Sequence, residues 1–185
     1  TEPQAGSDVA SIATTATKDG VDYIINGEKM FITGAGYADF FFVLTKTDSA
    51  AGYKGMSGFV VESNAEGVSL GKKESNMGQR CSDTRSVIFN NVRVPASQLI
   101  GGSESGGWMN AMNAFDMSRP NIAAQATGLA RAAFEHALQY SDERETFGQK
   151  LHQHQAIQFM LADMKTKVEA SRLLTWKSAA LADAG

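Results

Sequence analysis

The sequence predicts an α+β fold: a small antiparallel β-barrel or sandwich in residues 1–102, followed by half of a C-terminal four-helix bundle in residues 103–185. Two observations predict this fold. As far as Gly102, short runs of aromatic and β-branched residues are separated by Gly, Asp, Asn and Pro, which is typical of short strands. After a glycine-rich hinge, the apolar residues instead recur about every 3.6 positions, which is typical of helices.

The first expected element is a β-hairpin. A strand at 22–25 runs into Asn26 and Gly27, and the return strand is expected at 29–33. Asn-Gly is the strongest short hairpin signal because both residues tolerate the positive φ angles of a type I′ turn. Further strands are expected at 40–45, 58–62, 86–89 and 92–94. Several short strands at this spacing indicate a small antiparallel barrel or sandwich.

Two long helices are expected next, at 108–143 and 154–184, each with one apolar stripe. The stripes comprise Leu129, Ala133, Ala137 and Tyr140 in the first helix, and Ile157, Leu161, Met164 and Val168 in the second. Pro120 predicts either a kink or a helix start near Ser118. The turn at 146–153 makes the pair antiparallel, and because one partner helix cannot cover either stripe, the other half of the bundle is expected beyond Gly185.

The composition excludes several classes of protein. With 43% hydrophobic and 20% charged residues, the chain is globular rather than disordered. Its formal charge of −3 and scattered basic residues argue against nucleic acid as a partner. The longest apolar run, 40–44, is far shorter than the roughly 20 residues of a membrane span. The one cysteine, Cys81, cannot form an intramolecular disulfide, and no Cys and His cluster has zinc spacing, so no metal is expected.

Both ends of the sequence suggest that the chain is part of a longer protein. It begins at Thr1 without an initiator Met or a signal peptide, and it stops at Gly185 just after a run of helix-forming residues. We therefore expect further segments on either side. The single cysteine fits a reducing compartment, which predicts the cytoplasm for a bacterial protein and the mitochondrial matrix for a eukaryotic one.

Several short segments carry a resemblance to a known family. They are Thr-Glu-Pro-Gln-Ala-Gly-Ser-Asp at 1–8, Met-Phe-Ile-Thr at 30–33, Asn-Met-Gly-Gln-Arg-Cys-Ser-Asp-Thr-Arg at 76–85, Ala-Phe-Asp-Met-Ser-Arg-Pro at 114–120, Glu-Arg-Glu-Thr-Phe-Gly at 143–148 and His-Gln-Ala-Ile-Gln-Phe at 154–159. In this order and spacing they resemble acyl-CoA dehydrogenases, above all the medium-chain and short-chain branches. On this resemblance, residues 1–102 correspond to the middle β domain and residues 103–185 to the first helices of the C-terminal all-α domain.

The resemblance implies an FAD site. The positions in the first half of the chain that match FAD-binding positions are Thr1, Gly6, Ser7, Phe31, Ile32 and Thr33. Thr1 and its neighbouring backbone would serve the pyrimidine edge of the flavin, Thr33 would reach N5, and Phe31 would pack beside the ring. Fixed donors suit a flavin because the ring gains electron density on reduction. Family members often carry Trp where Phe31 stands, so the aromatic wall is kept and an indole N–H is lost.

A second set of implied FAD contacts lies near the end of the first helix. The matching residues are Arg144, Thr146, Phe147, His154 and Gln155. In the family these residues reach a neighbouring subunit's FAD, with Arg at the pyrophosphate and Phe at the adenosine half. The resemblance therefore implies a homotetramer built as a dimer of dimers. Without the resemblance, Arg144 would simply complement the helix dipole and His154 would be a cap or packing residue.

The resemblance also implies an acyl-CoA site formed by Ser7, Asp116, Ser118 and Arg119. The plainer alternatives are a solvated turn at 1–8, in which Ser7 caps the turn at Asp8, and a surface ion pair between Asp116 and Arg119.

No catalytic residue is expected in this chain. A carboxylate base must remove the α-proton of the thioester, and in most of the family that Glu lies downstream, here beyond Gly185. Two branches, the isovaleryl and long-chain types, carry it at the position of Ser118, and serine cannot act as that base at neutral pH.

The implied function is α,β-dehydrogenation of an acyl-CoA to the trans-2-enoyl-CoA in fatty acid β-oxidation: a Glu takes the proton from Cα, a hydride passes from Cβ to flavin N5, and electrons leave to electron-transferring flavoprotein. Three alternatives stay open. They are an acyl-CoA oxidase, a truncated non-catalytic module that binds flavin or acyl-CoA, and a β-sandwich interaction domain with a helical stalk.

Overall fold

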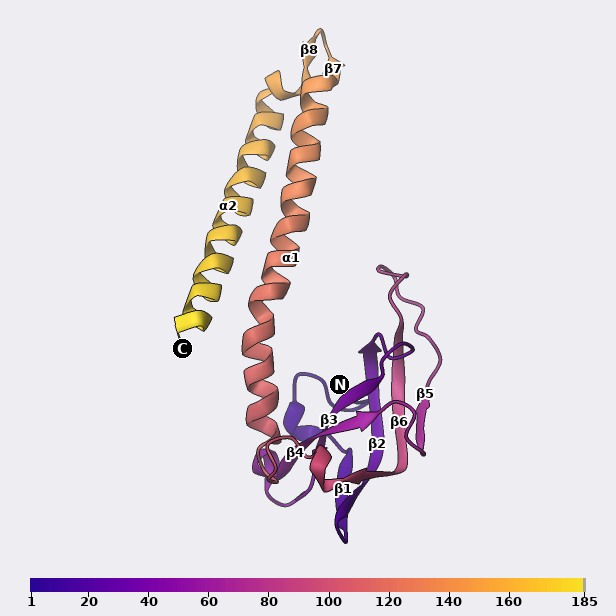
Figure 1. Cartoon of the computed structure of the whole chain (residues 1–185). Helices are drawn as coiled ribbons and strands as arrows, with labels where there is room; N and C mark the ends of the chain where they lie inside the picture. The colour runs from indigo at the N-terminus through magenta and orange to yellow at the C-terminus, as the bar shows by residue number, and fades with distance from the viewer. Residues whose placement is uncertain (185) are drawn as a thin grey trace. The chain divides into compact units, whose positions relative to one another are not determined.

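The computed structural model describes residues 1–184, which form two compact units (Figure 1). The first unit is Thr1–Met112 and the second begins at Asn113, inside the long helix α1 (Gly107–Glu143). The first turns of α1 belong to the first unit because Trp108, Ala111 and Met112 join an apolar cluster there. Gly185, the last residue of the expected segment 103–185, lies outside the described residues.

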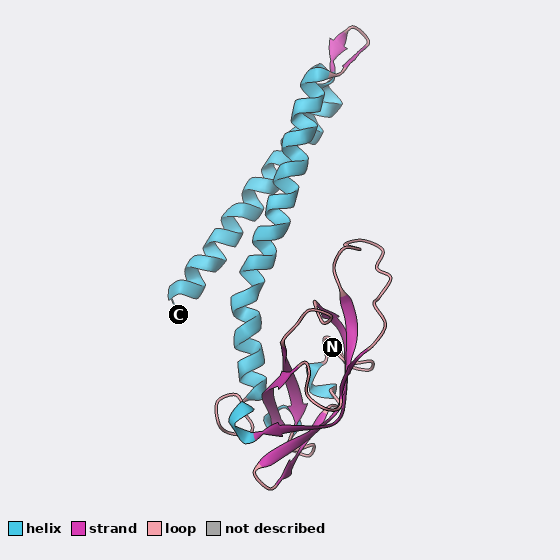
Figure 2. Cartoon of the chain, turned by 45° about the vertical axis from the view of Figure 1, so that its right-hand side comes forward, coloured by secondary structure: helices cyan, strands magenta, loops and turns pink. Residues whose placement is uncertain are grey.

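The first unit is built on one six-stranded sheet, in the order β4-β3-β1-β2-β6-β5. Its strands are drawn in magenta in Figure 2. The strands are β1 (Thr15–Asp19), β2 (Asp22–Thr33), β3 (Phe40–Lys46), β4 (Met56–Glu62), β5 (Val68–Leu70) and β6 (Thr84–Pro95). Neighbours are antiparallel except β1 and β3, which are parallel at the single pair Thr15 and Lys46. The predicted α+β class is confirmed, with a mixed sheet in place of a purely antiparallel one.

The sheet curls over a core of apolar side chains. Phe41 on β3 and Phe89 on β6 meet edge to face with ring centroids 6.5 Å apart. Two strands lie between β3 and β6 in the sheet, so in a flat sheet they would be about 14 Å apart at the usual strand spacing. Ile25, Val43 and Val87 are also fully buried in this core. Such curling is what a barrel-like or sandwich-like unit requires.

The predicted hairpin turn at Asn26 and Gly27 is wrong, because both residues lie inside the single strand β2. The turn falls earlier, at Gly20 and Val21, between β1 and β2. Gly20 has φ +64°, as the first central position of a type II′ turn requires. The Asn26 side chain instead pairs with a bulge in β6: its Oδ1 accepts from the Asn91 backbone N–H at 2.8 Å, and its Nδ2 donates to Asn91 Oδ1 at 3.1 Å.

The other strand predictions divide into three groups. The strands expected at 40–45 and 58–62 are confirmed within β3 and β4. Those expected at 86–89 and 92–94 are two parts of the one strand β6, interrupted only by the bulge. Strands β1 and β5 were not predicted. Thr-Ala-Thr-Lys-Asp in β1 contains one apolar residue and no aromatic one, and Val-Ser-Leu in β5 is only three residues long.

The second unit contains the two predicted long helices, with α2 spanning Gln155–Ala184. Helix α1 contains Pro120 without ending there, so the late helix start near Ser118 is wrong. Between the helices lie β7 (Glu145–Thr146), β8 (Gln149–Lys150) and the 3₁₀ turn η4 (Leu151–Gln153). The two-residue hairpin loop has positive φ at both Phe147 (54°) and Gly148 (74°), as a type I′ turn does.

The helix pair leaves large apolar side chains uncovered. Among residues 113–184 these include Ile122, Leu129, Leu138, Leu173, Trp176 and Leu181. Of the expected stripe residues, Val168 is buried whereas Leu129 and Tyr140 are exposed. Two helices alone cannot hide this much apolar surface, which agrees with half of a larger helical bundle. None of the helices in residues 1–184 is long and apolar enough to cross a membrane.

Candidate functional site

The segment 1–8 is anchored to the sheet rather than being a solvated turn. The backbones of Glu2 and Ala5 exchange two hydrogen bonds, at 2.7 and 3.1 Å, which closes a tight turn. Ala5 packs in the cluster around Met56, and Glu2 is only 4% exposed. The turn at Asp8 is closed by the Ser11 hydroxyl, so it does not need Ser7, which is exposed.

The Glu2 carboxylate is the centre of a buried hydrogen-bond network. It accepts from the backbone N–H of Ala13, from the backbone and hydroxyl of Thr14, and from Lys29 Nζ at 2.6 Å. Lys29 is 9% exposed, and its Nζ also donates to the Leu44 carbonyl at 2.6 Å. One ion pair therefore joins the segment 1–8 to strands β2 and β3.

Both members of this pair have shifted pKa values. Burial by itself would raise the pKa of Glu2, but the Ala13 amide, Lys29 and Thr14 outweigh it and lower the pKa from 4.5 to about 2. Burial lowers the pKa of Lys29, and the hydrogen bond to Glu2 opposes that shift. Near neutral pH Glu2 is thus a carboxylate that holds the adjacent backbone in place.

The structure brings the two halves of the predicted flavin site together. The backbone N–H of Met30 donates to the Thr1 carbonyl at 2.9 Å, so the segment 1–8 runs beside 30–33. Phe31 has φ +58° at a bulge where β2 shifts register against β6, and its side chain is 57% exposed. Left-handed backbone in a bulky residue is strained and is often found at binding sites. The exposed residues of this rim are Thr1, Gly6, Ser7, Phe31 and Thr33, with Ile32 half-buried.

Asp83 supports the end of the strand that carries Thr33, and the sequence interpretation missed it. The Asp83 carbonyl accepts from the Gly34 N–H at 2.6 Å, and its carboxylate accepts from the Gly36 N–H at 2.7 Å and from Arg85 Nε at 2.9 Å. Burial would raise the pKa of Asp83, but the Gly36 and Arg85 hydrogen bonds hold it below its usual value. Gly34 and Gly36, shortly after Thr33, were the only local signal. Arg85 therefore has a structural role through its ion pair with Asp83.

The second predicted set of FAD residues lies on and beside the β7–β8 hairpin. Thr146 Oγ1 and His154 Nε2 are 3.2 Å apart, and the rings of Phe147 and His154 meet edge to face at 6.3 Å. Phe147 is 97% exposed, and Arg144 and Gln155 are exposed as well. His154 therefore packs within the hairpin, whereas Arg144 and Phe147 point outward and are available to a partner.

Asp116 and Arg119 form an exposed ion pair on α1, with 2.7 Å between Oδ1 and Nη1. Such a pair contributes only a few tenths of a kcal/mol. Ser118 turns its hydroxyl to the Phe115 carbonyl at 3.1 Å. The surface ion pair expected from the sequence without the family resemblance is thus present, and both side chains are exposed to solvent.

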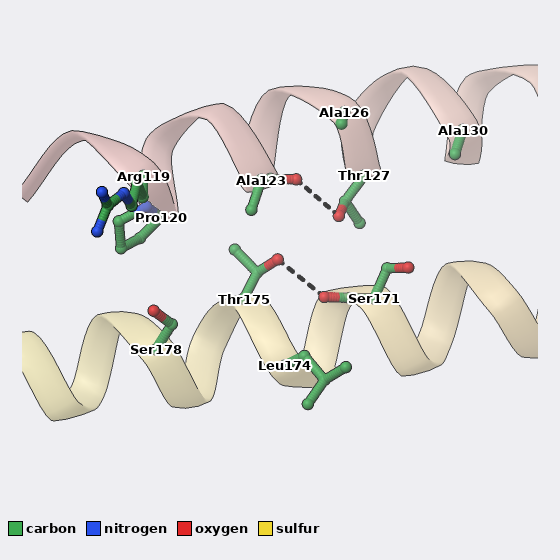
Figure 3. Close-up of a pocket in the computed structure, with 10 residues that line it drawn as sticks. All are labelled: Arg119, Pro120, Ala123, Ala126, Thr127, Ala130, Ser171, Leu174, Thr175 and Ser178. Carbon is green, nitrogen blue, oxygen red and sulfur yellow. Dashed lines mark hydrogen bonds between the residues drawn. The ribbon is translucent and has the colours of Figure 1, made fainter. Parts of the chain in front are cut away.

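A groove of about 590 Å³ runs between α1 and α2 in the second unit (Figure 3). Its lining residues are Arg119, Pro120, Ala123, Ala126, Thr127, Ala130, Ser171, Leu174, Thr175 and Ser178. The Thr127 and Thr175 hydroxyls bond to carbonyls one turn back in their own helices, at 2.8 Å each, as the dashed lines in Figure 3 show. With these groups satisfied and small alanines on the wall, the groove suits the packing of another helix better than a polar ligand.

Two family profiles match this chain. Residues 1–92 match "Acyl-CoA dehydrogenase, middle domain", and residues 105–185 match "Acyl-CoA dehydrogenase, C-terminal domain". Most of the β unit and the whole helix pair therefore match two consecutive domains of one class of protein, the acyl-CoA dehydrogenases. The chain belongs to the acyl-CoA dehydrogenase family.

Individual relatives agree with this assignment. The chain is 47% identical over 189 residues to "Probable medium-chain specific acyl-CoA dehydrogenase 2, mitochondrial" of Caenorhabditis briggsae, covering 100% of this chain and 46% of that protein. It is 42% identical over 183 residues to "Caffeyl-CoA reductase-Etf complex subunit CarC" of Acetobacterium woodii, covering 99% and 48%. The solved butyryl-CoA dehydrogenase of Megasphaera elsdenii superposes with a TM-score of 0.92 at 43% identity, covering 96% and 46%. The chain spans about half the length of the curated relatives it matches.

Proposed function

We propose that the whole protein is an FAD-dependent acyl-CoA dehydrogenase that converts an acyl-CoA thioester to the trans-2-enoyl-CoA. The observation that carries the proposal is the hydrogen bond from Met30 N–H to the Thr1 carbonyl, which brings two separate family segments to one exposed rim. Membership of the acyl-CoA dehydrogenase family supports the class of reaction.

The residues of this rim fit a flavin. Thr1, Ser7 and Thr33 are exposed residues that carry hydroxyl donors, and Phe31, in the same segment as Thr33, is 57% exposed. A flavin needs fixed donors along its pyrimidine edge and near N5, together with an apolar wall that excludes water from one face. When bound, FAD takes up the two electrons and the hydrogen that leave the substrate Cβ. Thr1 and Ser7 would orient the pyrimidine edge, and Thr33 would donate near N5.

The substrate contacts and the base complete the proposal. Arg119, which pairs with Asp116 on the exposed face of α1, would offer a cation to the phosphates of coenzyme A. Ser7 is exposed in the segment 1–8, where it would contact the acyl-CoA. The Ser118 hydroxyl donates to a backbone carbonyl and cannot remove an α-proton at neutral pH. We therefore assign the base to a Glu in the polypeptide that follows Gly185, so residues 1–185 on their own are not expected to catalyse the reaction.

The proposed partners follow from the hairpin and from one relative. Arg144 and Phe147 are exposed at the β7–β8 hairpin, where they would reach the FAD of a neighbouring subunit in a homotetramer. CarC is by name a subunit of a reductase complex with Etf, which supports electron-transferring flavoprotein as a partner of this protein. The dehydrogenation proposed here makes that partner the electron acceptor.

The test uses the full-length protein and a series of straight-chain acyl-CoA substrates of increasing length. The proposal predicts enoyl-CoA formation that depends on added electron-transferring flavoprotein, with slow reoxidation of the reduced flavin in air. Rapid reoxidation in air, with hydrogen peroxide as the product, would make the protein an acyl-CoA oxidase. A protein that binds FAD or acyl-CoA but forms no enoyl-CoA from any substrate would be a non-catalytic binding module.

A further inference from the structure

The buried pair Glu2–Lys29 is the one strongly buried ion pair in the part of the chain that the structure describes. Its side chains are 2% and 11% exposed, and 2.6 Å separates Glu2 Oε1 from Lys29 Nζ. The other ion pairs among residues 1–184 each have at least one partner that is substantially exposed. The Glu2–Lys29 pair is therefore not one of the exposed surface ion pairs, and its burial needs a separate explanation.

Stability alone does not explain this pair. Removing two charges from water costs several kcal/mol, and well-packed apolar residues often replace a buried pair without loss of stability. A buried ion pair whose hydrogen bonds are all made holds the surrounding chain in a fixed geometry. Here Glu2 accepts from Ala13, Thr14 and Lys29, and Lys29 reaches the Leu44 carbonyl, so four chain segments are held at one point.

Both members of the pair lie within two residues of a candidate flavin contact. Glu2 follows Thr1, whose carbonyl accepts from Met30. Lys29 precedes the Met30–Phe31 bulge, where Phe31 has φ +58°. A shift of either charged side chain would therefore move Thr1 and the bulge together.

We propose that Glu2 and Lys29 are positioning residues for the flavin ring: their ion pair sets the distance between the Thr1 donor and the strained Phe31–Thr33 segment. The inference rests on the proposed function, because it requires FAD at this rim. Neither side chain touches the flavin, and both act through the backbone of their neighbours.

The experiment measures FAD affinity and the visible absorption and circular dichroism of bound flavin in the full-length protein. The variants are Glu2→Gln, Lys29→Met and the double variant E2Q/K29M. The matched control is Tyr23→Phe. It removes one partly buried hydrogen bond to a carboxylate, that of Glu104, near the opposite end of β2. All variants are compared at a temperature at which each is folded.

Each single variant should weaken FAD binding about tenfold or more and alter the flavin spectrum, whereas Y23F stays within about twofold. The double variant should regain stability relative to the single variants without regaining FAD affinity. Unchanged FAD affinity and spectrum in E2Q and K29M, with only lower unfolding midpoints, would reduce the pair to a structural role. Should K29M fail to fold, the near-isosteric E2Q decides alone. A wild-type protein that binds no FAD overturns the proposed function itself, and the positioning role with it.

Discussion

Tyr23 on β2 and Phe59 on β4 pack ring against ring with centroids 4.9 Å apart, although β3 and β1 lie between their strands in the sheet. In a flat sheet these strands would be about 14 Å apart. The contact therefore measures how strongly the sheet curls. Tyr23 also donates from its hydroxyl to Glu104 at 2.6 Å, which ties the sheet to the loop before α1.

Tyr23→Phe keeps the ring contact and removes this hydrogen bond. We expect a loss of about 1–2 kcal/mol in the free energy of unfolding, because the lost partner is a carboxylate. Tyr37→Phe is the control, since Tyr37 is exposed and its substitution should change stability by less than about 0.5 kcal/mol. Urea denaturation of the full-length protein measures both. Equal stability of wild type and Y23F at pH 7 would contradict the expectation.

The Tyr23–Glu104 hydrogen bond should also make the free energy of unfolding depend on pH in the alkaline range. The hydrogen bond to Glu104, followed by burial, raises the pKa of Tyr23 from 10.0 to about 12. Because the folded-state pKa is the higher one, the contribution to stability is complete below pH 10 and is lost as the pH rises to about 12. The difference in stability between wild type and Y23F should therefore narrow across this range. A constant difference from pH 9 to pH 12 would show that the bond is not made in solution.

Gly27→Ala should be strongly destabilising. Gly27 has φ +150°, and a Cβ there would lie 2.4 Å from Thr14 Oγ1 and 2.7 Å from Thr14 Cα. We expect a loss of about 3 kcal/mol or more, together with displacement of Thr14 from Glu2. Gly20→Ala is the matched control: φ is +64° and no atom lies within 4 Å of the added Cβ, so only backbone strain of about 1 kcal/mol is expected. Equal losses in the two variants would refute the close packing described for Gly27.

Acid titration tests the burial of Glu2. Its pKa is lowered from 4.5 to about 2, so its contribution to stability is present above pH 4.5 and is lost as the pH falls toward 2. Glu2→Gln should cost about 3–5 kcal/mol near neutral pH, because it leaves the Lys29 charge unpaired. The stability curves of wild type and E2Q should converge between pH 4.5 and 2. Parallel curves through this range would mean that Glu2 is not ionised in a buried network.

Phe147→Ala separates binding from stability. Phe147 is 97% exposed, so its removal should change the free energy of unfolding by less than about 0.5 kcal/mol. If it stacks on the adenine of a neighbouring subunit's FAD, affinity for FAD should fall about tenfold or more. Met77→Ala, at an equally exposed residue outside both predicted FAD sets, is the control. Isothermal titration calorimetry of the apoprotein with FAD measures the affinity of each variant. An unchanged FAD affinity in F147A would show that Phe147 does not contact the cofactor.

The fold class was predictable from the sequence because the spacing of apolar residues and the preference of residues for strands are local signals. The long helices α1 and α2 follow directly from apolar spacing. The hairpin turn was misplaced because the strong preference of Asn-Gly for a type I′ turn is a local signal. Long-range pairing overrides it: Asn26 pairs with Thr15 on β1, and its side chain bonds to Asn91 on β6.

The candidate site was predictable only through the family resemblance. The roles of Thr1, Thr33 and Phe147 cannot be derived from propensity, and their FAD contacts remain predictions. The support around them was not visible in the sequence. Glu2 and Lys29 are charged residues 27 positions apart, and nothing local indicates that both are buried and paired. Likewise, no propensity scale predicts a left-handed backbone at a phenylalanine such as Phe31.

The most direct test of the proposed dehydrogenase activity is an anaerobic titration of the purified full-length protein with straight-chain acyl-CoA. The visible absorbance of the flavin is recorded during the titration. We expect a yellow protein that contains FAD and loses its oxidised flavin absorbance as substrate is added. A colourless protein that refuses added FAD, or a flavin that stays oxidised with every acyl-CoA tried, would contradict this expectation.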